Sequence, residues 1–202
     1  MNIDSICKYS IGFDFISPAE LNDTGIGSAY TRRYLEVLNS TFPDEHIVEQ
    51  CAQEGFCLLP QPPDRISLLE IRRLLSKQFP YPHEAPWYEK EEFAHSQRTG
   101  EYWLAIKKTI IPHSNRRTWQ EQQDMLLANE RVPNIAEMAW FILIYGLTRN
   151  VHLYQRIAAR TISSHLSGHV CVGDCASRGI NVTVLNDVDC SSSIGLSVAK
   201  DI

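Results

Sequence analysis

The residues with the greatest potential for chemistry lie near the end of the sequence, where imidazole, thiol and carboxylate groups follow one another closely. They are His165, His169, Cys171, Cys175, Asp187, Asp189 and Cys190. Thiolates and imidazoles are the ligands that zinc prefers in proteins. Residues 165–190 are therefore a candidate metal site, with His169, Cys171 and Cys175 as its candidate ligands. The related alternative is a Cys/His hydrolase, because an imidazole can activate a nearby thiol as a nucleophile.

The spacing of the two cysteines argues against a shared metal ion. The sequence around Val170 and Val172 predicts a strand, which would place Cys171 and Cys175 about 13 Å apart on one face. Two thiolates that bind one zinc ion can be no more than about 4.6 Å apart. A metal site would therefore require a break in the strand, and we expect neither a metal nor another cofactor.

A second group of candidates is basic and could bind phosphate groups: Lys107, Lys108, Arg116, Arg117, Arg156 and Arg160. Arg156 and Arg160 are expected to share one face of a strand. Basic side chains between aromatic ones are typical of proteins that bind single-stranded nucleic acids. The whole chain is acidic, however, with 24 Asp and Glu against 19 Lys and Arg, so we favour a solvated rim of charges.

Helix starts are marked clearly in the sequence. Three capping boxes begin at Ser67, Thr118 and Asn134, each with a Glu three residues later. The helix from Asn134 to about Arg149 is apolar on nearly all sides, which predicts a central core helix. The helix that begins at Thr118 is expected to run to about residue 128, and residues 88–99 predict a polar surface helix.

Strands are expected mainly in the C-terminal part. Residues 56–59 and 102–107 predict two short strands. Residues 153–162, 169–175 and 180–185 are rich in Val, Ile and Thr and predict an antiparallel meander with a turn at 176–179. Helices followed by strands predict an α+β fold, with the helices packed on one face of a small, mostly antiparallel sheet.

The length of 202 residues fits a single domain. Residues 1–86 are expected to be mostly helical and acidic, and residues 87–202 to hold the core helix and the sheet. The first residues lack the basic and apolar regions of a signal peptide. The longest apolar run, Met138 to Leu147, is too short to span a membrane. With six scattered cysteines, these features predict a cytoplasmic protein with reduced thiols and no membrane contact.

Several segments between residues 87 and 199 together resemble an uncharacterised family of bacterial hypothetical proteins. The segments are 102–108, 111–112, 118–122, 132–133, 137–140, 170–173 and 195–197. The most specific of them is the Trp-x-Glu-Gln sequence at Trp119. The resemblance implies a bacterial or mobile-element origin and supplies no catalytic residues. The chain departs from the family pattern at Lys107 and at Cys175, where an aromatic residue is expected; a small buried apolar role for Cys175 fits that position.

Taken together, these patterns predict a non-enzymatic protein-interaction or structural domain with a protein partner. One alternative is a metal-binding protein or Cys/His hydrolase that uses residues 165–190. The other is a protein that binds nucleic acid or another phosphate ligand through Lys107, Lys108, Arg116 and Arg117. The sequence contains no complete catalytic signature, so no catalytic residue is predicted.

Overall fold

The computed structural model describes residues 15–26, 30–81, 83–176 and 179–202 of the chain, without the side chains of residues 22, 23 and 174–176. Its helices are α2 (Pro18–Asp23), α3 (Arg32–Ser40), α4 (Glu45–Gln53), α5 (Leu68–Leu74), the 3-10 helix η2 (Ser76–Gln78), α6 (Glu92–Ser96), α7 (Trp119–Gln123) and α8 (Ile135–Arg149). Its strands are β1 (Phe56–Pro60), β2 (Trp103–Lys107), β3 (Ala158–His165), β4 (Gly168–Ala176), β5 (Gly179–Leu185), β6 (Ile194–Leu196) and β7 (Ala199–Asp201).

The strands form two sheets, and the expected α+β class is confirmed. One sheet is antiparallel with the order β1-β2-β7, and the other has the order β5-β4-β3-β6. The predicted meander corresponds to β3, β4 and β5. The last two strands of the chain separate, because β6 pairs in parallel with β3 whereas β7 joins β2 in the other sheet. The mostly antiparallel strands are thus divided between two sheets, where the sequence predicted a single one.

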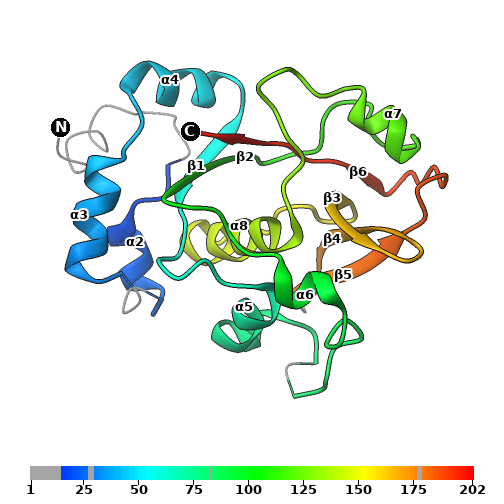
Figure 1. Ribbon diagram of the computed structural model, residues 1–202, viewed down its shortest axis with the longest axis horizontal. Helices are drawn as coiled ribbons and strands as arrows, with labels where there is room; N and C mark the ends of the chain where they lie inside the picture. Colours follow the sequence, from blue (N-terminus) through cyan, green and yellow to red (C-terminus); the bar gives the residue numbers. More distant parts are fainter. Residues whose placement is uncertain (1–14, 27–29, 82, 177–178) are drawn as a thin grey trace.

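Helix α8 is the centre of the molecule and is buried from Ile135 to Tyr145. It packs against α5 and against β3, β4 and β5, and Figure 1 shows it below β1 and β2, with α5 and α6 beneath it. The indole N–H of Trp140 donates to the carbonyl of Pro60 at the end of β1, at 3.2 Å. A helix with no polar face must be covered on most sides, and the two sheets and α5 provide that cover.

The four-stranded sheet is also covered on its second face. Val170 and Val172 of β4 belong to the main core around α8, whereas Arg160 and Cys171 are paired across β3 and β4. Side chains alternate between the faces of a sheet, so Arg160 and Cys171 face away from α8. Arg160 meets Gln122 of α7 there. Helices therefore lie on both faces of this sheet, although they were expected on one.

Three predicted boundaries are wrong. The surface helix expected at 88–99 is reduced to α6, because Tyr88 and Phe93 are buried in the core and residues before Glu92 form turns. Helix α7 ends at Gln123, before the expected residue 128. Strand β3 begins at Ala158 because Tyr154 and Arg156 have positive φ angles of 56° and 61°, which a strand does not permit.

The predicted turn at 176–179 lies partly outside the described residues, although Ala176 and Gly179 are paired at its ends. None of the described helices has the length and apolar character that crossing a membrane requires.

Candidate functional site

The histidines and cysteines of residues 165–190 do not converge on one point. His169 lies on β4, where its Nδ1 is 2.6 Å from a carboxylate oxygen of Asp187 and its ring stacks on Trp119 at 3.9 Å. His165 lies at the other side of the hairpin, next to Trp87 and Glu91. The sequence grouped the two histidines, but the structure gives each of them a different set of partners.

Cys171 is completely buried beside Arg160. Burial raises the pKa of its thiol to about 11, in spite of the nearby guanidinium. A thiol at neutral pH is a poor nucleophile and a poor metal ligand, because both roles require the thiolate. Cys190 is exposed on the loop after β5, and the side chain of Cys175 lies outside the described part of the structure. Among the side chains that are described, no three His, Cys, Asp or Glu residues are grouped as metal ligands.

Two of the basic candidates, Lys107 and Arg160, are engaged inside the protein. The Nζ of Lys107 lies 3.3 Å from Glu130 and above the ring of Phe56. Arg160 has no exposed surface and donates to Gln122 at 3.1 Å. Arg156 is exposed and precedes β3, so the prediction that it shares a strand face with Arg160 is wrong. Lys107 and Arg160 are therefore committed to contacts within the protein.

The remaining basic candidates lie on loops. The backbone N–H of Arg116 donates to the carbonyl of Ser191 at 2.8 Å, and Nε of Arg117 donates to the carbonyl of His113 at 2.9 Å. Lys108 is half-buried at the end of β2. The Arg117 side chain and the Arg116 backbone help to fix this loop. The phosphate-binding alternative stays a prediction for Lys108, Arg116 and Arg117.

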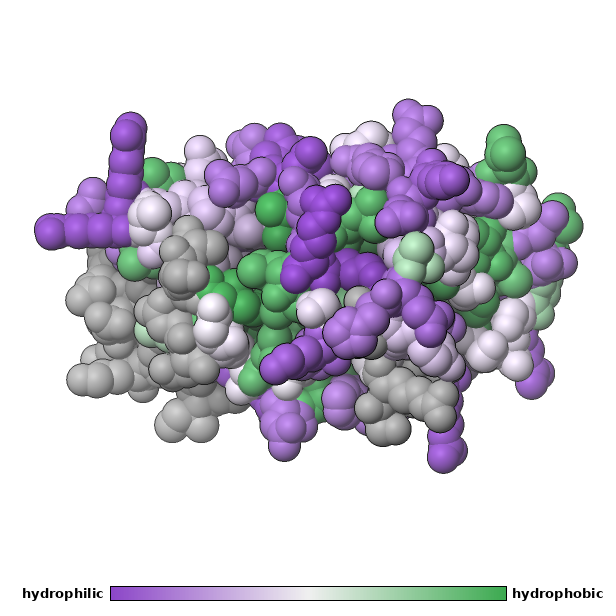
Figure 2. Space-filling model, turned by 90° about the horizontal axis from the view of Figure 1, so that it is seen from below, coloured by the Kyte–Doolittle hydropathy of each residue, from purple (hydrophilic) through white to green (hydrophobic). Residues whose placement is uncertain are grey.

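The surface carries apolar residues in separate groups. Figure 2 shows two of them on one face of the molecule, near its middle and at its right-hand end, with hydrophilic side chains between them. A continuous apolar surface would mark a large interface. The described residues of this face therefore lack the continuous apolar surface of a large interface.

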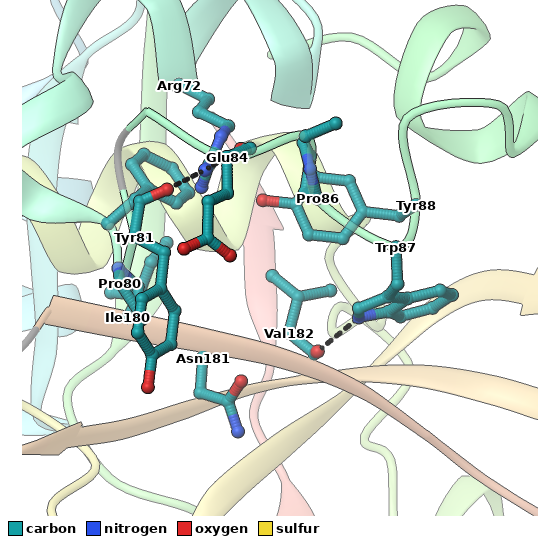
Figure 3. Close-up of a pocket in the computed structure, with 12 residues that line it drawn as sticks. Arg72, Pro80, Tyr81, Glu84, Pro86, Trp87, Tyr88, Ile180, Asn181 and Val182 are labelled. Carbon is teal, nitrogen blue, oxygen red and sulfur yellow. Dashed lines mark hydrogen bonds between the residues drawn. The ribbon is translucent and has the colours of Figure 1, made fainter.

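A hollow with a volume of about 280 Å³ lies between β5 and the segment that follows η2. We call it the aromatic groove. Its twelve lining residues come from α5, from that segment and from β5: Arg72, Phe79, Pro80, Tyr81, Glu84, Ala85, Pro86, Trp87, Tyr88, Ile180, Asn181 and Val182. Figure 3 shows the carboxylate of Glu84 between Tyr81 and Val182, with the amide of Asn181 below it.

Arg72 of α5 holds the segment in place. Its Nη2 donates to the carbonyl of Tyr81 at 2.9 Å and to that of Glu84 at 3.0 Å, and its guanidinium lies 5.2 Å from the ring centre of Phe79. Hydrogen bonds from a charged donor are stronger than neutral ones. A buried arginine thus fixes two points of a segment that forms no helix or strand.

Trp87 is half exposed, with 50% of its surface accessible, but it is fixed on several sides. Its Nε1 donates to the carbonyl of Val182 at 2.9 Å, which attaches the segment to β5. The rings of Tyr88, Phe93 and His165 lie within 6.0 Å of it. The result is an immobilised aromatic surface that faces solvent.

Tyr88 forms the inner wall of the groove and Tyr81 its outer wall. Burial raises the pKa of the Tyr88 hydroxyl, so this group stays protonated at neutral pH. Tyr81 is 61% exposed. The sequence contains one signal for this site, the closely spaced prolines and aromatic residues of 79–88. The same residues also fit the end of one helix followed by a surface helix, so they do not by themselves predict a groove.

Two other hollows have less specific linings. One, of about 490 Å³, lies beside Arg131, whose guanidinium is occupied by Glu137 and Asp201. The other, of about 200 Å³, lies at the end of α8 near Gly146 and Ile180. The aromatic groove differs from both because it combines exposed rings with the edge of a sheet.

The chain matches no protein-family model, no curated protein and no solved structure.

Proposed function

We propose that this chain is a non-enzymatic protein-interaction domain that binds an extended segment of a partner protein in the aromatic groove. The observation that carries the proposal is Trp87, an aromatic side chain that is half exposed and yet held by a hydrogen bond and three rings. Binding energy at protein interfaces is concentrated in tryptophan, tyrosine and arginine side chains. Fixing such a side chain before binding reduces the entropy that association costs.

The position of β5 favours an extended ligand. β5 is an edge strand of its sheet, and the Val182 carbonyl faces away from β4 towards the groove. Backbone groups alternate in direction along a strand, so those of Val184 face the same way. Among the described residues, no backbone group outside the sheet pairs with Val184. A segment that lies on Tyr81 and Trp87 can therefore add a main-chain hydrogen bond at Val184, which is a common form of peptide recognition.

The contacts of the His169–Asp187 pair fit a structural role. The backbone N–H of Trp119 donates to the Asp187 carbonyl at 2.9 Å, and the Trp119 ring stacks on His169. The Cys171 thiol on the same strand is buried and protonated. These contacts fasten the loop after β5 to the sheet.

Selection from a random linear peptide library tests the proposal. We expect peptides to be enriched on the folded protein, and we expect Tyr81→Ala to weaken their binding about tenfold or more, the cost of removing an aromatic anchor. Tyr81 is exposed and its backbone carbonyl is retained, so the variant should fold as the native chain does.

Tyr102→Ala is the matched control, because Tyr102 is also an exposed tyrosine but does not line the groove. Circular dichroism establishes that both variants are folded. Peptides that bind Tyr81→Ala as tightly as the native chain would place the interaction elsewhere and overturn the proposal, as would a selection that enriches no peptide.

A further inference from the structure

We infer that the partner segment presents a lysine or arginine side chain, whose cationic group lies in the aromatic groove next to Glu84. The inference rests on the proposed function and names the chemistry of its ligand. It follows from the charges of the groove, from the acidity of its surroundings and from the type of its walls.

The accessible charge of the groove is negative. Of its twelve lining residues, Glu84 and Arg72 are charged at neutral pH. Arg72 is 9% exposed and directs its donors at two carbonyls. Glu84 is exposed, its carboxylate points into the groove in Figure 3, and it has no ion pair among the described residues. A cationic ligand would therefore meet an available carboxylate.

The segment around the groove is acidic as well. Four glutamates lie within residues 80–92, at positions 84, 89, 91 and 92, against a single lysine at position 90. Of these glutamates only Glu84 lines the groove, and the others add to the negative charge of the segment that carries it. The local field should attract cationic segments and repel acidic ones, including nucleic acids.

The walls of the groove suit the rest of such a side chain. Tyr81 and Trp87 present exposed aromatic surface, which attracts a cation within about 6 Å of a ring centre. The methylene groups of lysine or arginine can lie along the rings and prolines while the charge reaches Glu84. An apolar side chain would fit the rings but would remove water from the Glu84 carboxylate without replacing it, which is unfavourable.

The test uses three synthetic pentapeptides that differ only at the centre: acetyl-Ala-Pro-X-Pro-Ala-amide, where X is lysine, arginine or norleucine. Binding is followed in the uniformly ¹⁵N-labelled full chain through the indole N–H resonance of Trp87, which is assigned by its absence in Trp87→Phe. We expect the lysine and arginine peptides to shift this resonance and the norleucine peptide to bind about three- to thirtyfold more weakly, from the combined contribution of a cation on an aromatic ring and an exposed ion pair.

Glu84→Gln should weaken binding of the lysine peptide about two- to fivefold. It should not weaken binding of the norleucine peptide, because a neutral amide costs less to dehydrate than a carboxylate. The matched control is Glu36→Gln on α3, which removes the same charge from an exposed carboxylate that does not line the groove. It should leave both affinities unchanged.

The outcomes separate the two proposals. Equal or tighter binding of the norleucine peptide would overturn the cationic ligand and leave the groove as a peptide site. Equal loss in Glu84→Gln and Glu36→Gln would also overturn it, because the effect would then come from net charge alone. If the library selection finds no groove-dependent peptide and none of the pentapeptides shifts Trp87, both the ligand and the proposed function are overturned.

Discussion

Arg160 and Cys171 are neighbours on adjacent strands, and burial decides the role of each. The guanidinium of Arg160 has no exposed surface, and its Nε has no hydrogen-bond partner among the described residues. Its other groups reach Gln122 and two backbone carbonyls. A buried charge destabilises the fold unless it is well paired. We therefore interpret Arg160 as a structural residue that joins the sheet to α7 and to the loop after β5. The thiol next to it stays protonated for the same reason, the absence of water.

The cysteines should differ strongly in reactivity. Burial raises the Cys171 pKa to about 11, so about one thiol in a thousand is ionised at pH 8. Cys190 is exposed. We expect iodoacetamide at pH 8 to modify Cys190 in the native protein and to leave Cys171 intact until the chain is unfolded. Peptide mass mapping before and after denaturation measures both.

Raising the pH should increase the native-state modification of Cys171, because its ionised fraction grows as the pH approaches its pKa. Cys51, whose pKa burial also raises, serves as the internal control and should follow the same trend. Modification of Cys171 at the same rate as Cys190 at pH 8 would show that the second face of the sheet is open to solvent.

At the level of single elements, α8 shows how a buried helix is started. The side chain of Asn134 accepts hydrogen bonds from the N–H groups of Ala136 and Glu137, and Glu137 accepts from the N–H of Asn134. The Nδ2 of Asn134 donates to the carbonyl of Arg98 as well, at 2.9 Å. The hydroxyl of Ser163 on β3 accepts from the N–H of Ile135 at 2.8 Å. The free N–H groups of the first turn are thus satisfied by the cap and by one neighbouring strand.

Asn134→Ala should lower the free energy of unfolding by about 1–2 kcal/mol, because it removes the helix cap. Asn134→Ser keeps an acceptor for the first-turn N–H groups and loses the donor to Arg98, so it should cost less. Urea denaturation of the two variants and the native chain measures the difference.

Thr118→Ala provides the comparison for this prediction. Thr118 caps α7 with the same kind of capping box, but α7 is only five residues long and its cap is exposed. Thr118→Ala should therefore lower the free energy of unfolding by less than Asn134→Ala does. An equal cost at the two positions would contradict the central role of the α8 cap.

At the level of the whole molecule, the two sheets are connected through one core. A single cluster of buried apolar residues extends from Phe15 to Ala199 and includes residues of α8, of β1 and β2, and of β3 to β5. Trp140 joins α8 to β1 by its hydrogen bond to Pro60. Neither sheet can bury its inner face without α8, so we expect the chain to unfold as one unit, as a single domain does.

Cooperative unfolding can be measured directly. Urea denaturation followed by far-UV circular dichroism and by tryptophan fluorescence should give coincident transitions. Trp140→Phe should lower the urea midpoints of both transitions by the same amount, because it removes the indole donor and part of the central packing. Two separate transitions, or a shift in one signal alone, would divide the chain into two independent units.

Much of the fold is predictable because its signals are local. The capping boxes at Ser67, Thr118 and Asn134 are all present as expected, since each involves groups only three residues apart. The burial of α8 follows from its composition. In contrast, the prediction of a helix at 88–99 is wrong because Tyr88 and Phe93 are buried in the core. No local sequence pattern indicates that burial.

The sequence by itself determined the α+β class, the helix starts and the central helix, because hydrogen bonds and apolar periodicity within a few residues specify them. Only the tertiary structure decided which strands pair, so that β6 and β7 joined different sheets. It also separated His165 from His169 and buried Arg160. The aromatic groove is also a feature that only the tertiary structure decided, because Trp87 and Val182 are 95 residues apart in the sequence. Such contacts depend on the packing of the whole chain, and spacing along the sequence does not reveal them.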